Sequence, residues 1–536
     1  MKRILCLLLA VMMTVALFSG CEQEEKPYIP TGDALDHGIG VTTPTQQQEK
    51  KTLSLPYYPE KTLNPYMCAD YTNRTLFPLL YQGLFVTDSK GVTSPVLCKS
   101  FSVSADMRTY TFTLENAAFS DGITLTSEDV VASMNVARGE SFYWGRFRHV
   151  VSVEATDPNT VVIRLDTPCE NFHVLMDIPI VKASDVGEPF PIGTGPYFIQ
   201  EAIAGIRLRK HPEWWCDAAL PVTFPYIPLV EVESTRDIRD QFEADKIGLV
   251  CANPCSDAFA DFRCDYELWD CENGVFLYLT AHMDSKIFSN DAVRSALSSS
   301  IDRDFLVRAY YRGSAHASAL PAPPTSSYYD ADLAADYSYD ISKLTKAVEE
   351  AELVGEEVVL LVNKEDTVRL RVAKAIGQML SQSGLKVTIL ETIDMYCQNY
   401  LLTGEYDLYL GQTRLSPNMD LTPFFAKEGS LNYGKLDDIS MYYLGLDALA
   451  NSGNYYDLYR KVMDDGRLVP ILFQRYAIYA ARGVITELNP ARDALFYYDL
   501  GKRLEDAITH EKPVEPPTES TEPTDATAPA ETQPAP

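Results

Sequence analysis

Alternating apolar and polar residues predict two β-strands in the first third of the chain, near residues 108–114 and 161–165. The apolar positions are Tyr110, Phe112 and Leu114 in the first segment and Val161, Ile163 and Leu165 in the second. Between the two segments, Thr126 and Asp129 have the spacing of a helix capping box, and apolar residues follow them at helical spacing. The pattern indicates half-buried strands of an antiparallel sheet with a helix between them.

The pattern changes in the second half of the chain. Residues 358–362 form a continuous apolar run, and apolar residues then recur at helical spacing between 368 and 379. A second strand at 385–389, a helix near 395–402 and a third strand at 406–410 follow. This order predicts a βαβαβ run, which gives a parallel sheet with right-handed crossovers. Ligands usually bind at the carboxyl ends of such strands, so the segment after the third strand is a candidate for the site.

The N-terminus has the features of an export signal. Lys2 and Arg3 precede a run of about fourteen mostly apolar residues that ends in small residues before Cys21, and this run is too short for a comfortable membrane span. The small residues before Cys21 are similar to the bacterial lipobox, in which the cysteine carries lipid, although Phe18 stands where that motif prefers an aliphatic residue. A plain signal peptide cut nearby is the alternative.

The two ends of the exported chain are polar. Residues 21–49 carry no apolar periodicity, and we expect a flexible stalk that is lipidated at Cys21. Residues 506–536 form a tail rich in Pro, Thr and Glu. We expect this tail to be disordered, because it cannot bury enough apolar surface to offset the entropy of ordering.

Composition then narrows the class of protein. The chain has 536 residues, of which 46% are hydrophobic, so it can form two or three domains with large cores. Its formal net charge of −29 excludes nucleic acid as a natural partner. Cys251, Cys255, Cys264 and Cys271 cluster without a standard zinc spacing, so we expect neither a metal nor a cofactor. The histidines are scattered: His37, His149, His173, His211, His282, His316 and His510.

A set of short motifs resembles the peptide/nickel class of solute-binding proteins that serve ABC importers (bacterial extracellular family 5). Phe119-Ser120-Asp121-Gly122 and Gly193-Thr194-Gly195-Pro196-Tyr197 are the most recognisable of them. Others occur in the expected order, at Leu63-Asn64-Pro65, Trp214-Trp215, Ile301-Asp302-Arg303 and Tyr406-Asp407-Leu408. We expect Gly193 and Gly195 to serve the backbone torsions of a passage between domains.

The resemblance implies a two-lobed α/β protein of the type II periplasmic-binding-protein-like fold (cluster C), with an extra α+β domain inserted in the first lobe. Mapped onto this chain, lobe one would comprise residues 50–82, 190–272 and 470–505. The inserted domain would comprise residues 83–189, and lobe two residues 273–469.

The chain departs from the family at the ligand site. Peptide-binding relatives carry Gly-Trp-x-x-Asp after the strand that matches 406–410, and its carboxylate holds the peptide ammonium. Here the run is Gly411-Gln412-Thr413-Arg414-Leu415, so the tryptophan and that carboxylate are missing. Arg414 indicates a carboxylate or phosphate on the solute, although a salt bridge to Asp420 that only shapes the loop is equally compatible. The candidate ligand-binding residues are Arg414, Asp420, Asn432, Tyr433, Tyr57 and Tyr58.

The resemblance therefore implies an extracellular, lipid-anchored protein that captures a small solute by lobe closure. The solute would be peptide-like and could be anionic. The other partners would be an ABC permease with its ATPase subunits, and the protein would be a monomer on the outer face of a Gram-positive membrane. We expect no enzymatic activity, because no GxSxG or HExxH motif occurs. A sensory receptor on the same fold is the first alternative function, and a hydrolase tethered to the cell surface is the second.

Overall fold

The computed structural model describes residues 53–482 and 484, except 89–90, 140, 204, 219–221, 223, 257–261, 437 and 483. The expected signal peptide, the stalk with Cys21 and the C-terminal tail lie outside the described residues. Within the described part of the chain, no helix has the length and apolar character needed to cross a membrane.

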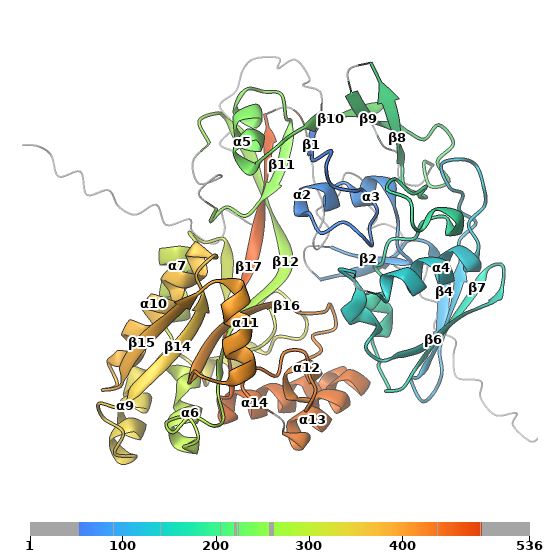
Figure 1. Cartoon of the computed structure of the whole chain (residues 1–536). Coiled ribbons are helices and arrows are strands. Elements are labelled where there is room, and N and C mark those ends of the chain that lie inside the picture. The colour runs from blue at the N-terminus through green and yellow to red at the C-terminus, as the bar shows by residue number, and fades with distance from the viewer. Residues whose placement is uncertain are drawn as a thin grey trace, which may run out of the picture.

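Two long antiparallel strands, β12 (Tyr266–Ala281) and β17 (Leu468–Ala481), join two bodies of the molecule (Figure 1). Near one end of this pair, β17 pairs with β11 (Leu249–Ala252). Toward the other end, β12 pairs with β16 (Leu408–Arg414). The register of β12 against β17 shifts after Glu272, and such a bulge bends the strand at the crossing. The predicted lobe limits at 272 and 470 fall inside these two strands and stay predictions.

Lobe one holds a four-stranded sheet in the order β1-β10-β9-β8, in which β1 pairs with β10 in parallel and the other pairs are antiparallel. Its strands are β1 (Leu55–Tyr57), β8 (Tyr197–Ala202), β9 (Gly205–Lys210) and β10 (Tyr226–Glu231). Its helices are α2 (Tyr71–Arg74), α3 (Phe77–Leu80) and α5 (Thr235–Glu243).

The extra domain confirms the first predicted pattern. Its antiparallel sheet has the order β4-β5-β7-β6, and Tyr110, Phe112 and Leu114 are the buried residues of β5. Helix α4 begins after Thr126, whose backbone N–H donates to Asp129 Oδ2 at 2.9 Å. The elements are β2 (Phe85–Thr87), β3 (Thr93–Pro95), β4 (Cys98–Val103), β5 (Thr109–Leu114), α4 (Ser127–Ala137), β6 (Val150–Asp157) and β7 (Thr160–Leu165).

Lobe two confirms the second predicted pattern, because β14 pairs in parallel with both β15 and β16. Its strands, besides β16, are β13 (Ala315–Ala317), β14 (Glu357–Asn363) and β15 (Lys386–Thr392). Its helices are α6 (Asp291–Ala296), α7 (Arg303–Tyr310), α8 (Ala331–Ala335), α9 (Ile341–Glu350), α10 (Thr367–Ser381), α11 (Asp394–Thr403), α12 (Thr422–Phe425), α13 (Ile439–Ala450) and α14 (Tyr455–Asp465). Short 3-10 turns across the molecule are η2 (Trp144–Phe147), η3 (Phe172–Leu175), η4 (Ala183–Asp185), η5 (Leu297–Ser299) and η6 (Ser452–Asn454).

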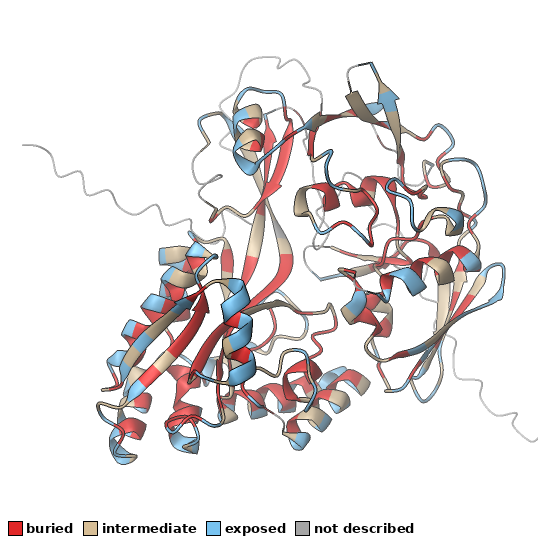
Figure 2. Ribbon diagram, in the orientation of Figure 1, coloured by how far each residue is buried: buried red, intermediate tan, exposed pale blue. Residues whose placement is uncertain are grey.

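The cores follow this architecture. One apolar cluster runs through lobe one and the extra domain together. Lobe two has two large clusters, and neighbouring residues of β12 divide between them: Leu277 belongs to one, and Phe276 and Tyr278 to the other. Because successive strand residues point to opposite faces, these clusters cover the two faces of the lobe-two sheet. In Figure 2 the helices of this lobe present buried residues on one side and exposed residues on the other.

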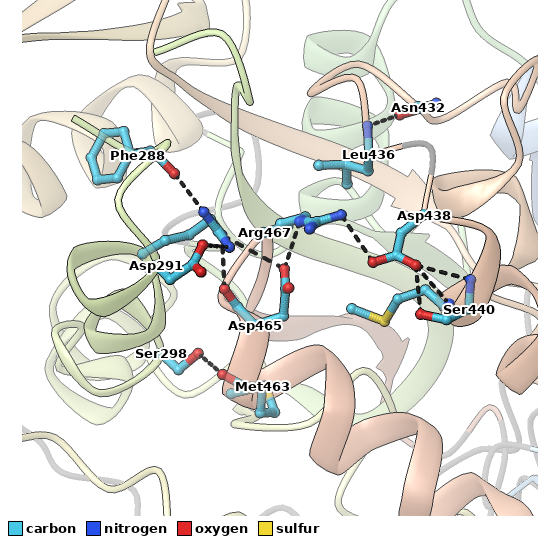
Figure 3. Close-up of polar contacts among 12 residues, drawn as sticks. Phe288, Asp291, Ser298, Asn432, Leu436, Asp438, Ser440, Met463, Asp465 and Arg467 are labelled. Carbon is cyan, nitrogen blue, oxygen red and sulfur yellow. Dashed lines mark hydrogen bonds and ion pairs between the residues drawn. The ribbon is translucent and has the colours of Figure 1, made fainter. Parts of the chain in front are cut away.

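A chain of ion pairs fixes the helices of lobe two (Figure 3). Asp465 at the end of α14 lies 3.7 Å from Arg294 of α6 and 2.8 Å from Arg467. Arg467 in turn lies 3.2 Å from Asp438, the N-cap residue of α13. Burial raises the pKa of the Asp465 carboxyl, while Arg467 and Arg294 act to lower it. The network joins three helices and gives Arg294 a structural role.

We expect His173 to make the stability of the extra domain depend on pH. Its ring stacks on Phe101 with centroids 5.0 Å apart, and burial lowers its pKa to about 4. Since an unfolded histidine titrates near 6.5, the unfolded state takes up the proton first, and stability falls as pH drops from about 6.5 toward 4. Between pH 7 and 4.5 we expect the wild type to lose about 2 kcal/mol more than His173→Phe, as measured by urea unfolding. Equal losses of unfolding free energy in the wild type and in His173→Phe would contradict this prediction.

Candidate functional site

Arg414 ends β16 and does not lie on a loop beyond it. The sequence predicted that this strand ends at Leu410, but pairing with β12 extends it, with Arg414 opposite Val275. The extension comes from a partner strand more than a hundred residues earlier in the chain. Arg414 is therefore held by a sheet, at the point where β12 crosses between the lobes.

Three guanidinium groups gather around the ring of Phe142 in the extra domain. The guanidinium carbon of Arg74 lies 3.4 Å from the ring centroid, that of Arg414 lies 5.1 Å away and that of Arg146 lies 5.9 Å away. Arg74 ends α2 in lobe one, and Arg146 lies in η2 of the extra domain. The ring thus brings together cations from lobe one, the extra domain and lobe two. We call Arg74, Phe142, Arg146 and Arg414 the arginine cluster.

One member of the arginine cluster has a buried counter-ion. Asp177 accepts from Arg146 Nε at 2.5 Å and from Nη2 at 2.6 Å, and both side chains are largely buried. Burial alone would lower the pKa of Arg146, but the charge and hydrogen bonds of Asp177 reverse the effect and raise it. This bidentate pair neutralises one of the three charges.

The other two arginines are destabilised in their charged form. Burial and the neighbouring Arg74 lower the pKa of Arg414 to about 10, and Arg146 acts in the same direction. Burial also lowers the pKa of Arg74, with Arg146 adding repulsion while Tyr143 and Tyr71 oppose it. Across the part of the chain that the structure describes, Arg74 forms no ion pair with a carboxylate. Arg74 and Arg414 thus bring two buried guanidinium groups from distant segments of the chain to one aromatic ring.

A cavity of about 350 Å3 lies in lobe one beside the cluster. Tyr71 and Tyr476 line it, meet edge to face with centroids 4.6 Å apart, and also act on the pKa of Arg414. Tyr58 is on the same wall, with its backbone N–H and C=O both bonded to Asn73. Hydroxyl-bearing side chains, apolar residues of β11 and the carboxylate of Asp70 line the cavity together, and such a mixed wall suits a small polar molecule.

A larger cavity of about 580 Å3 lies between the extra domain and lobe two. Its walls come from residues 87–88, 91–93, 171 and 173–174 of the extra domain, from Glu272 and Gly274 at the crossing, and from residues 323 and 325–328 of lobe two. Among the described residues, hydroxyl groups, the amide of Asn171, the ring of His173 and two carboxylates, Asp88 and Glu272, line it.

Asp420 is occupied by neighbours other than Arg414. Its Oδ2 lies 2.8 Å from Arg148 Nη1 of the extra domain, and its Oδ1 accepts from the backbone N–H and the hydroxyl of Thr422. The alternative of an Arg414–Asp420 salt bridge is therefore wrong. Asp420 instead connects the extra domain to lobe two. A second link supports this contact, because the N–H of Ser452 donates to Glu170 Oε2 at 2.7 Å.

Asn432 and Tyr433 shape the loop on which they lie. The amide of Asn432 donates to the Ala426 carbonyl at 3.1 Å, and its Oδ1 accepts from the Leu436 N–H (Figure 3). The ring of Tyr433 packs edge to face on Tyr409 with centroids 5.6 Å apart. The structure brings neither residue to the arginine cluster.

Tyr57 is 1% exposed in the core of lobe one, so a solute cannot reach it.

Three members of the arginine cluster were not predicted from the sequence: Arg74, Phe142 and Arg146. No local motif marks them, because they lie on separate segments that meet only in the folded protein. The one available signal was the dense run of aromatic and basic residues at 142–149 in an acidic chain.

Comparison with known proteins agrees with this architecture. The model of the family described as bacterial extracellular solute-binding proteins, family 5 (middle), matches residues 93–432. The glutathione-binding protein GsiB of Escherichia coli (strain K12) is 25% identical over 352 residues, which cover 61% of this chain and 67% of that protein. Its counterpart in Salmonella typhi is also 25% identical, over 355 residues.

Solved structures share the fold at low sequence identity. HbpA2 from Haemophilus parasuis has a TM-score of 0.71 and 19% identity, with 84% of this chain and 99% of that chain covered. The ABC transporter substrate-binding protein CtaP from Listeria monocytogenes has a TM-score of 0.69 and 20% identity, with coverage of 84% and 98%. The two-lobed α/β fold expected from the sequence is confirmed.

Proposed function

The chain belongs to the bacterial extracellular solute-binding proteins of family 5, and from this premise we propose that it binds an anionic, peptide-like solute between its lobes for delivery to an ABC importer. Proteins of this family deliver solutes to such importers and are not enzymes. Binding occurs by hinge closure, in which the solute stabilises the closed arrangement of the lobes.

The arginine cluster is the observation that supports an anionic solute. Arg414 of lobe two and Arg74 of lobe one lie around one aromatic ring at the junction of the lobes. A guanidinium binds carboxylate or phosphate through a planar fork of donors. The name of the relative GsiB gives its ligand as glutathione, a peptide with free carboxylates, which is the same chemical class.

The missing family carboxylate shapes the expected specificity. Asp420 could have replaced it after a rearrangement of the loop, but Arg148 and Thr422 occupy its oxygens. A peptide ammonium buried near Arg414 would therefore lack a partner, which costs about 3 to 5 kcal/mol. We propose that unmodified peptides without a further anionic group bind poorly.

We also propose a location for the protein. A lipid on Cys21 and a stalk over residues 21–49 would hold it on the outer face of a Gram-positive membrane. A tether confines the solute trap near its permease and raises the effective concentration of the complex. Mutating Cys21 to serine should then release the protein into the medium, as immunoblotting of the cell fraction and the culture fluid would show.

Mass spectrometry of small molecules that co-purify with the native protein tests the function most directly. Transport of the identified solute should require the permease; uptake that persists without this protein would favour a sensory receptor instead.

In a thermal-shift screen, Arg414→Ala should weaken binding of the identified solute about thirtyfold or more, because one charge of a buried pair is lost. Arg164→Ala, an exposed change of equal charge, should have no effect. Strong stabilisation by neutral unmodified tripeptides would contradict the specificity.

A further inference from the structure

Polar contacts join the extra domain to lobe two. Arg148 Nη1 lies 2.8 Å from Asp420 Oδ2, and Glu170 Oε2 accepts from the Ser452 N–H at 2.7 Å. The Glu170 N–H donates in turn to the Leu449 carbonyl at 2.8 Å. The side chain of Leu449 reaches from α13 into the apolar cluster that lobe one and the extra domain share. Because that cluster makes lobe one and the extra domain one body, these contacts span the two bodies that a hinge movement would separate.

The ring of His149 lies between two carboxylates at this contact. Its Nδ1 is 3.1 Å from Asp166 Oδ1 of the extra domain, and its Nε2 is 3.9 Å from Asp420 Oδ2 of lobe two. Nε2 is buried and has no hydrogen-bond partner among the described residues. Because an ionised carboxylate can only accept, Asp166 places a proton on Nδ1, and a neutral ring then turns the lone pair of Nε2 toward Asp420. A second proton, on Nε2, would instead offer Asp420 a positively charged donor from the opposite body.

The other titratable groups around this contact do not compete with His149 near neutral pH. Burial raises the pKa of Cys169 and of Tyr328 to about 12 and raises that of Tyr455 further, so all three side chains stay neutral. Burial lowers the pKa of His173, elsewhere in the extra domain, to about 4. Aspartate, glutamate and arginine side chains ordinarily keep their charge between about pH 5.5 and 8, whereas histidine changes its charge there.

We propose that His149 is a pH-sensitive latch, whose Nε2 takes up a proton, pairs with Asp420 and holds the extra domain against lobe two. Above neutral pH the ring is uncharged, and Arg148 alone pairs with Asp420 across the contact. By linkage, the state that binds the additional proton more tightly gains population as pH falls, so acid favours the latched arrangement. The latch does not depend on a solute. Only its consequence rests on the proposed function: a solute enclosed between the lobes would leave more slowly in an acidic medium.

Hydrogen exchange in the protein without added solute tests the latch. The N–H groups of Glu170 and Ser452 donate across the contact, so they exchange when the latch opens. Mass spectrometry of the peptides that contain them gives their protection factors, relative to the intrinsic exchange rate at each pH. In the wild type we expect these factors to rise at least about tenfold from about pH 8 to about pH 5.5, as a charge pair about 4 Å apart should produce. His149→Gln should remove the rise.

Two further variants make the test specific. Asp420→Asn removes the charge from the lobe-two side, keeps an acceptor for the Thr422 N–H, and should also abolish the rise. His316→Gln is the matched control, because it removes another imidazole–carboxylate pair, 2.9 Å from Glu272, and should leave the rise intact.

Circular dichroism establishes that each variant is folded. A wild type whose protection factors do not change with pH would overturn the inference. So would a rise that persists in folded His149→Gln or Asp420→Asn, or one that His316→Gln removes equally. Since the experiment contains no added solute, its result is independent of the transport and binding assays for the proposed function.

Discussion

Asp177→Ala is expected to lower the free energy of unfolding by about 3 to 5 kcal/mol, because it leaves the buried guanidinium of Arg146 without its counter-ion. The pair is bidentate, with 2.5 and 2.6 Å contacts, and the Arg146 side chain is 8% exposed. The positive charges of Arg74 and Arg414 in the same cluster should increase the loss. Urea unfolding at pH 7, followed by circular dichroism, measures the effect.

An exposed ion pair of similar length provides the control. Lys286 lies 2.7 Å from Glu356, but the two side chains are 71% and 38% exposed. Glu356→Ala should therefore cost less than about 1 kcal/mol, because water screens the pair and solvates the remaining charge. Equal losses in the two variants would mean that burial does not govern the Arg146–Asp177 pair. Asp177→Asn should fall between them, since an amide keeps the hydrogen-bond acceptor without the charge.

Local sequence patterns predicted the elements whose signal is local. Strand β5 alternates in the sequence, and its buried residues follow that alternation, whereas in β7 Val162 is buried as well as the predicted Val161, Ile163 and Leu165. The βαβ order of lobe two was likewise readable, because the period changes from strand to helix within short segments. The true end of β16 was not readable. Residues Gly411–Arg414 become strand only through pairing with β12, which lies far away in the sequence.

The candidate site was predictable in part. Arg414 was found because it lies in the run that departs from the family motif Gly-Trp-x-x-Asp, and the structure puts it at the junction of the lobes. Arg74, Phe142 and Arg146 carry no such marker, and their significance arises from convergence of three segments. Asp420 was correctly expected on a loop beyond the parallel strands, but its partner Arg148 lies more than 250 residues earlier, beyond the reach of spacing arguments.

The glycines of the Gly193-Thr194-Gly195 motif have a role different from the expected one. Neither has a positive φ angle, so the expectation that they serve special backbone torsions is wrong. Instead, the chain passes close to the end of α3. The N–H of Gly195 donates to the Leu80 carbonyl at 3.0 Å, and a Cβ on Gly195 would lie 2.5 to 2.7 Å from backbone atoms of Leu79 and Leu80. Close approach explains both glycines, since a Cβ on Gly193 would also overlap the Leu80 carbonyl.

Gly195→Ala is therefore expected to destabilise the protein by about 3 kcal/mol or more, because backbone atoms cannot move aside as a flexible side chain can. Gly187→Ala is the matched control: it is nearby in sequence, has no positive φ and has no atom within 4 Å of an added Cβ. It should be neutral or stabilising by a few tenths of a kcal/mol, through reduced entropy of the unfolded chain. Thermal unfolding of both variants measures the difference. Equal melting temperatures would show that the passage beside α3 can widen, and the motif would then need another explanation.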